Sequence, residues 1–188
     1  MPTKIGHSEI KAGPEAGLAE GEFIAYPSTF TREPDSYGDI VARGAFLRGI
    51  KDRADKGIKL PCLYGHRSDD PDYYIGHAIT ESEDERGWKI RGKFDLDSPK
   101  GAHVYRLVRD GLLRELSFAY ETKDSAPVTL ADGRKARELR DLDVTEFSFV
   151  PQGANRDTHV AQVKSSNHAA RIRKVRAAHL KAQFGHLN

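Results

Sequence analysis

The 188-residue chain is long enough for one domain with a terminal extension, and its 38% hydrophobic and 31% charged residues are typical of a protein with a polar surface. No apolar run approaches the roughly 18–20 residues that a membrane-spanning helix needs, and the N-terminus lacks the apolar core of a secretory signal. The single cysteine, Cys62, excludes an internal disulfide framework.

Positive charge gathers near the C-terminal end of the chain. Residues 165–188 contain five Lys or Arg and no acid, which leaves 25 basic and 28 acidic residues in the rest of the chain. A nucleic-acid-binding domain more often carries its basic excess on the folded body. We therefore expect no specific nucleic-acid partner and no membrane association.

Alternating apolar and polar residues, interrupted by turn residues, predict a chain rich in strands. In chain order, the predicted strands are residues 20–30, 39–46, 58–66, 73–83, 87–96, 116–125 and 137–151. Helices are predicted over 44–57 and 98–113, the second with Ser98 as its N-cap and Gly111 as its stop.

The last two predicted strands are expected to be antiparallel neighbours, because Asp132-Gly133 between them is a hairpin signal. At least six strands with two helices indicate a β-rich α+β fold, a small and partly closed antiparallel β-barrel with surrounding helices. We expect a flexible arm over residues 1–20, a domain over 21–163, and a basic, helical tail over 164–188.

Three side chains suggest acyl-transfer chemistry. Ser117 lies mid-strand in RELSFAYE, His66 follows an apolar strand, and Glu146 lies on a strand face that it is expected to share with Val144 and Ser148. A serine hydroxyl is a poor nucleophile unless a base takes its proton, and a histidine oriented by a carboxylate can do so. Taken alone, each of these residues is more often structural than catalytic.

Other sites compete for the same residues. A metal site could be built from a group of acids and histidines, namely His66, Asp69, Asp70, Asp72 and His77, although a solvated turn explains these residues better. Cys62 could pair with His66 if both lay in one strand, although a buried, inert thiol fits its apolar neighbours better.

The order of these segments resembles a known family, the tailed-bacteriophage prohead proteases, which are capsid-maturation serine proteases similar to herpesvirus assemblin. The resemblance covers residues 20–163. The matching segments are DSYGDIVARGAF (35–46), LYGH (63–66), YIGHAITESEDERGWKIRGKF (74–94), GLLRELSFAY (111–120), LDVTEFSFVPQGAN (142–155) and a short final strand near THVAQV (158–163).

The resemblance implies a catalytic set of His66, Ser117 and Glu146 with no cofactor. Two details depart from the family pattern: Glu115 stands where Gly is frequent before the Leu-Ser pair, and residues 151–155 replace an Asn-Pro-Ala-Asn run. That neighbourhood helps to form the oxyanion hole in assemblin-like folds, which implies a role for the backbone near Asn155 and Arg156.

The function that the resemblance implies is limited proteolysis inside an assembling capsid in the host cytoplasm. A serine endopeptidase would cut the scaffold or major capsid protein, and then itself, and a homodimer is one arrangement that the resemblance allows. The alternative is a non-catalytic assembly factor of the same fold, which would use its basic tail to bind a partner.

Overall fold

The computed structural model describes residues 3–6, 11–12 and 17–151. The predicted tail over 164–188, the short strand near residues 158–163, and both Asn155 and Arg156 lie outside these described residues. Within the described part of the chain, no helix is long and apolar enough to cross a membrane.

The described residues form strands, two α-helices and one short 3-10 helix. The strands are β1 (Thr3–Gly6), β2 (Lys11–Ala12), β3 (Glu22–Thr29), β4 (Asp39–Val41), β5 (Pro61–Tyr64), β6 (Tyr74–Glu83), β7 (Gly87–Phe94), β8 (Glu115–Thr129) and β9 (Lys135–Val150). The helices are α1 (Leu47–Asp55), α2 (Pro99–Arg109) and the 3-10 helix Pro71–Tyr73.

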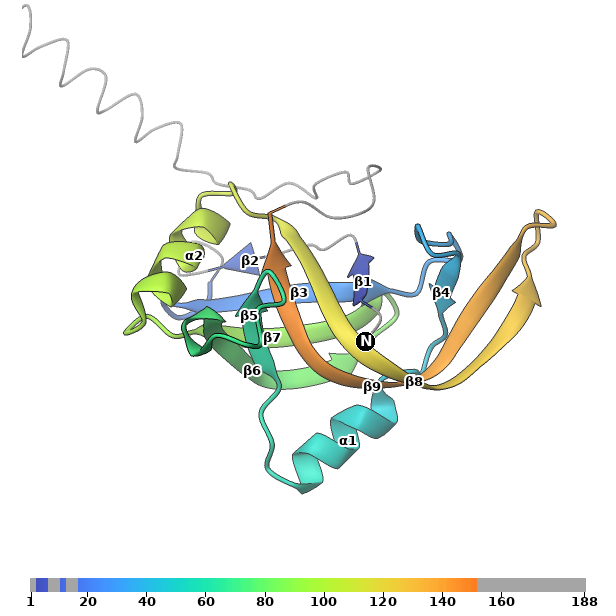
Figure 1. The fold of residues 1–188 in the computed structure, drawn as a ribbon, viewed down its shortest axis with the longest axis horizontal. Coiled ribbons are helices and arrows are strands. Elements are labelled where there is room, and N and C mark those ends of the chain that lie inside the picture. The colour runs from blue at the N-terminus through green and yellow to red at the C-terminus, as the bar shows by residue number, and fades with distance from the viewer. Residues whose placement is uncertain (1–2, 7–10, 13–16, 152–188) are drawn as a thin grey trace, which may run out of the picture.

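These strands form a single nine-stranded sheet in the order β1-β8-β9-β5-β6-β7-β3-β2, and β4 pairs with β9 outside that path. The sheet curls into a partly closed barrel with the two α-helices on its outside (Figure 1). This arrangement confirms the predicted β-rich α+β fold. Most neighbouring strands are antiparallel, but β9 pairs in parallel with both β4 and β5.

Aromatic side chains fill the inside of the curled sheet. Phe23 and Phe94 lie with their ring centroids 4.8 Å apart, and Phe149 contacts both rings. Farther along the barrel, Phe46 stacks on Trp88 with centroids 4.7 Å apart. All five side chains are almost completely buried, so burial of aromatic surface supplies the main driving force for closing the sheet.

β8 and β9 form a long hairpin whose outer half projects from the body, with β4 beside it (Figure 1). The predicted hairpin at Asp132-Gly133 is confirmed, and Gly133 adopts the left-handed conformation that such a turn favours (φ 85°). Both strands extend closer to the turn than the sequence predicts, because a small apolar cluster of Ile40, Leu130 and Ala136 supports the projecting end.

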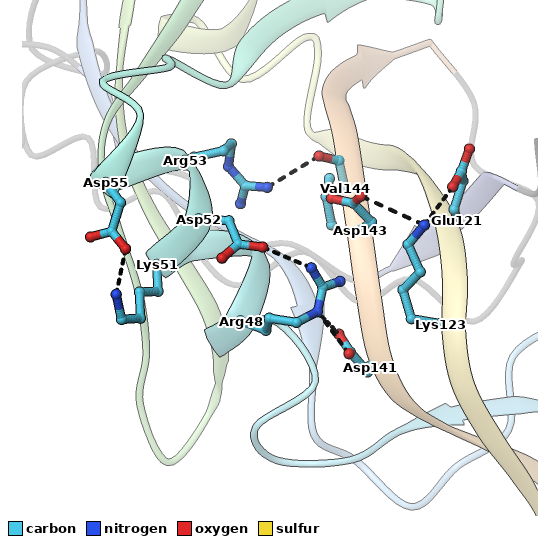
Figure 2. Close-up of polar contacts among 10 residues, drawn as sticks. All are labelled: Arg48, Lys51, Asp52, Arg53, Asp55, Glu121, Lys123, Asp141, Asp143 and Val144. Carbon is cyan, nitrogen blue, oxygen red and sulfur yellow. Dashed lines mark hydrogen bonds and ion pairs between the residues drawn. The ribbon is translucent and has the colours of Figure 1, made fainter.

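Ion pairs fix α1 against the sheet. Figure 2 shows Arg48 of α1 donating to Asp141 of β9 (2.8 Å) and to Asp52 of its own helix (3.0 Å). Figure 2 also shows Arg53 donating to the carbonyl oxygen of Val144. Arg53 forms a buried pair with Glu81 of β6 as well (2.6 Å). The helix therefore contacts the two strands that flank β5.

The helix α1 begins three residues later than predicted. Residues 44–46 form a turn in which the backbone N–H groups of Gly44 and Phe46 donate to the Glu83 carboxylate, at 2.6 and 2.8 Å. A carboxylate near a helix N-terminus satisfies donors that have no partner inside the helix. Glu83 comes from β6, so this helix start depends on a distant residue.

Two of the strands fall within the arm that the sequence predicts over residues 1–20. β1 pairs with β8 and β2 pairs with β3, so each of them extends one end of the sheet. Backbone pairing with an existing edge strand can hold such segments even though they have no apolar periodicity of their own. For that reason the sequence pattern does not reveal them.

Candidate active site

The ladder between β8 and β9 places three polar side chains on one face of the sheet. Ser117 pairs with Ser148, and Ala119 pairs with Glu146. Directly paired residues of antiparallel strands point to the same side, as do residues two apart on one strand. Ser117, Glu146 and Ser148 therefore share a face, while the alternate residue Phe147 lies in the core.

Val144 does not share the Glu146 face, contrary to the sequence prediction. The register passes from Ala119–Glu146 to Tyr120–Val144, so the ladder skips Thr145, whose hydroxyl donates to the carbonyl of Ala119 (3.2 Å). This bulge turns Val144 into the core. Glu146 is thus the first residue of β9 after the bulge, on the face opposite the core.

His66 reaches this face through a sharp turn at the end of β5. Gly65 and His66 both adopt left-handed backbone conformations, with φ of 68° and 59°. The N–H of Gly65 donates to the carbonyl of Phe149 (3.0 Å), and the N–H of His66 donates to Ser148 Oγ (3.2 Å). A left-handed histidine is unfavourable unless its surroundings hold it, and such strain concentrates at functional sites.

The imidazole of His66 is oriented by a carboxylate. His66 Nδ1 lies 2.6 Å from Glu146 Oε1, and Ser148 Oγ donates to the other carboxylate oxygen, Oε2, at 2.5 Å. Because the carboxylate accepts, Nδ1 carries a proton, and in the neutral imidazole Nε2 then presents its lone pair. Among the described residues, Nε2 has no hydrogen-bond partner.

Burial differs among the four side chains. Ser117 and Ser148 are fully buried, and the Glu146 side chain is 7% exposed, whereas that of His66 is 26% exposed. Solvent therefore reaches part of the His66 side chain, although its Nε2 atom is itself buried. A nearly buried carboxylate interacts with an adjacent positive charge more strongly than an exposed one, because less water screens the interaction.

The structure places His66 against Glu146 and brings Ser117 to the same face, one strand away. The residue that sequence reasoning underrated is Ser148, which contacts both Glu146 and the His66 backbone. The alternation Glu-Phe-Ser in β9 was the available signal. This alternation puts Ser148 on the same face as Glu146, but nothing in the sequence shows that the turn after β5 brings His66 into contact with Ser148.

Cys62 lies on the opposite side of the sheet from His66. It pairs with Phe147 and belongs to the core, so the predicted buried thiol is what the structure shows. Burial, with a smaller effect from the negative charge of Glu146, raises the pKa of the Cys62 thiol well above its usual value. A neutral thiol is a poor nucleophile.

The acids after His66 stabilise their own loop. Asp69 accepts a hydrogen bond from Arg67 (3.0 Å), and Asp70 accepts the N–H of Asp72 (3.0 Å) at the start of the 3-10 helix. His77 lies on β6, where burial and then the charges of two lysines lower the pKa of its imidazole. No three His, Cys, Asp or Glu residues are arranged to hold a metal ion within the described part of the chain.

Comparison with known proteins identifies the family. A family model described as "Caudovirus prohead serine protease" matches residues 9–172, which is more than half of the chain. A comparison with curated proteins found no match, and neither did a comparison with solved structures. The match confirms the resemblance drawn from the segment order. The chain therefore belongs to the caudovirus prohead serine protease family and is a serine endopeptidase of bacteriophage capsid maturation.

Proposed function

We propose that the chain cleaves its substrate with a triad in which Ser117 is the nucleophile, His66 the general base and Glu146 the orienting carboxylate. The observation that carries this proposal is the 2.6 Å contact between His66 Nδ1 and Glu146 Oε1, with Ser117 on the same face of the sheet. The contact fixes the tautomer in which Nε2 can accept a proton.

The reaction follows from these roles. His66 Nε2 takes the proton of Ser117 Oγ as the oxygen attacks the carbonyl carbon of a peptide bond. The imidazolium then gives that proton to the leaving amine, and an acyl-enzyme forms. Water, deprotonated by the same nitrogen, hydrolyses the ester and restores the Ser117 hydroxyl. Glu146 stabilises the imidazolium in both steps.

The negative charge that develops on the carbonyl oxygen needs hydrogen-bond donors. The backbone near Asn155 and Arg156 stays the proposed source of these donors, on the strength of the resemblance alone. Both residues follow β9 closely in the chain, so they can reach the end of the sheet where Ser117 and His66 lie. The carbonyl is expected to arrive from the side of His66, the exposed member of the set.

The proposed substrate is the scaffold or shell protein of the assembling prohead, followed by the protease itself. The basic segment 164–188 fits two roles in this scheme. It can carry the protease to an acidic partner, or it can be a solvated end that the enzyme removes. Lys and Arg clusters attract acidic partners over distances near the Debye length, which favours the first role.

A time course by intact-mass spectrometry tests this proposal. Wild-type chain, Ser117→Ala and Ser28→Ala are each incubated with the shell protein; Ser28 is the matched control because it too is a buried strand serine. We expect cleavage by wild type and Ser28→Ala, and none by Ser117→Ala. Equal cleavage by all three proteins would move the nucleophile away from Ser117, with Ser148 the next serine to substitute.

Labelling with a serine-directed fluorophosphonate supplies a readout that needs no substrate. The wild-type chain should gain one adduct at Ser117, and His66→Ala should lose it because the hydroxyl is then no longer deprotonated. An adduct on another serine, or labelling that persists in His66→Ala, would contradict the proposed roles.

A further inference from the structure

We propose that β1 occupies, within the same chain, the strand position beside Ser117 that an extended polypeptide substrate takes, so that the N-terminal segment competes with substrate. This inference rests on the proposed role of Ser117 as the nucleophile. Its partner class is an unfolded, extended peptide, and the competing ligand is the segment Thr3–Gly6 of the chain itself.

The pairing register is the first observation. β1 runs antiparallel to β8, with Ile5 opposite Ser117 and Gly6 opposite Leu116. The other edge of β8 is taken by β9. Any further strand that pairs beside Ser117 must therefore use the edge that β1 now holds. Paired strands lie about 4.8 Å apart, which brings a peptide backbone next to the proposed nucleophile.

The character of the β8 edge is the second observation. Between Leu116 and Ala119 the strand pairs regularly with both of its neighbours, without a register shift. Farther out, the ladder with β9 shifts on both sides of Asp124, and the strand carries Lys123 and Pro127. Charges, proline and bulges are the features by which proteins discourage strand addition.

The contrast along one strand indicates where an extended chain can pair. The outer part of β8 carries features that oppose pairing, and within the described residues no strand covers that side of it. The part that contains Ser117 lacks them and is paired with β1. Strand addition to such an edge is a common way to recognise extended peptides, since backbone groups supply affinity and alternate side chains supply selectivity.

The short length of β1 allows its displacement. It contains four residues, so its few backbone hydrogen bonds are largely offset by the conformational entropy lost when the segment is ordered. A longer substrate segment that also fills side-chain sites can replace it. The N-terminal segment would then raise the apparent KM without changing the chemical step.

Two proline substitutions in the full-length chain test the competition. Successive residues of an edge strand point their N–H groups alternately toward and away from the neighbouring strand. Of Lys4→Pro and Ile5→Pro, one therefore removes a hydrogen bond to β8, and the other leaves that bond in place and serves as the matched control. With a fluorogenic peptide, we expect the disruptive variant to lower KM roughly 2- to 10-fold at unchanged kcat, which is the effect of one lost backbone hydrogen bond.

A binding assay decides the inference without relying on activity. A fluorescent peptide with the sequence of residues 2–8, PTKIGHS, is titrated by anisotropy into full-length Ser117→Ala, with and without Lys4→Pro and Ile5→Pro together. We expect clearly tighter binding to the triple variant, because its own β1 no longer competes. A peptide with both prolines should not bind.

The kinetic and binding measurements distinguish a failure of the β1 proposal from a failure of the proposed triad. Equal KM for all chains, together with equal peptide binding to both Ser117→Ala proteins, would overturn the role of β1 while leaving the triad intact. Cleavage that persists in Ser117→Ala would instead contradict the proposed triad. The peptide titration would still report whether β1 and a second extended chain use the same edge.

Discussion

Replacing Ser148 by alanine should weaken both the fold and the candidate site, without removing the proposed nucleophile. Ser148 is fully buried and makes two hydrogen bonds. Its hydroxyl donates to Glu146 Oε2 at 2.5 Å and accepts the His66 N–H at 3.2 Å. Alanine keeps the backbone unchanged and removes both hydrogen bonds at once.

The expected loss of stability follows from these two bonds. A hydrogen bond to a charged group contributes about 1.5–3 kcal/mol, and leaving a buried donor unsatisfied costs about 1–3 kcal/mol. The contact between the His66 N–H and Ser148 is only partly buried, so water can recover some of the second contribution. We expect the Ser148→Ala chain to lose about 3 kcal/mol in the free energy of unfolding.

Ser28→Ala is the matched control for the stability measurement. Ser28 is 2% exposed on β3, but its hydroxyl has no hydrogen-bond partner among the described residues. Removing a buried hydroxyl that makes no bond should be neutral or slightly stabilising. Urea unfolding followed by tryptophan fluorescence compares both variants with the wild type, since the only tryptophan, Trp88, is buried in the core.

Activity gives the second part of the prediction. Ser148→Ala should keep measurable peptide hydrolysis with a kcat lowered about 10- to 100-fold, because Glu146 and His66 lose their support but not their chemistry. Ser117→Ala should have none. If Ser148→Ala unfolded at the same urea concentration as Ser28→Ala, or if it abolished activity while Ser117→Ala retained it, the reasoning would be wrong.

Three further predictions concern other parts of the structure. Gly65→Ala should lower the free energy of unfolding by about 1–2 kcal/mol and also lower kcat, because Gly65 has a left-handed backbone beside His66. The added methyl group would contact no neighbour, so backbone strain is the only cause. Unchanged urea unfolding would contradict this prediction. Burial raises the pKa of Tyr120 to about 12. The stability that its neutral phenol confers is therefore complete below the unfolded pKa of about 10 and is lost as the pH rises through about 12. We expect this loss to be about 3 kcal/mol in the free energy of unfolding, and alkaline unfolding of Tyr120→Phe should lack the decline. Arg53→Ala should lower the free energy of unfolding by about 3–5 kcal/mol, because the nearly buried Glu81 carboxylate then has no partner. The double variant Arg53→Met with Glu81→Leu should regain most of that loss in the same urea assay.

The sequence predicts local structure well where one segment decides its own conformation. The hairpin at Asp132-Gly133 and the Ser98 N-cap of α2 follow from residue types in a row, and the structure shows both. The predicted start of α1 is wrong because the N–H groups of Gly44 and Phe46, just before the helix, are satisfied by Glu83, which is 37 residues from Phe46. Distant partners of this kind leave no local pattern.

In the candidate site too, local features can be predicted from the sequence, whereas contacts between distant segments cannot. Alternation in β9 places Glu146 and Ser148 on one face, which the sequence predicts. The bulge at Thr145, which turns Val144 inward, depends on how β8 and β9 fit together, and no residue type signals it. The contact of His66 with Glu146 also required the parallel pairing of β5 with β9, which joins segments about 80 residues apart.

The strand β9 determines the geometry of the site because both of its edges are used at the same place. Over Phe147–Phe149 it pairs in parallel with β5 on one edge and antiparallel with β8 on the other. His66 and Ser117 come from those two neighbours, so both are positioned relative to a single strand. A slip of β9 by one residue would exchange its two faces, moving Glu146 into the aromatic core, away from His66, and taking Phe147 out of that core. Burying an unpaired carboxylate is costly, and so is removing aromatic surface from the core. The residues that build the core thus also fix the alignment of the proposed acid, base and nucleophile.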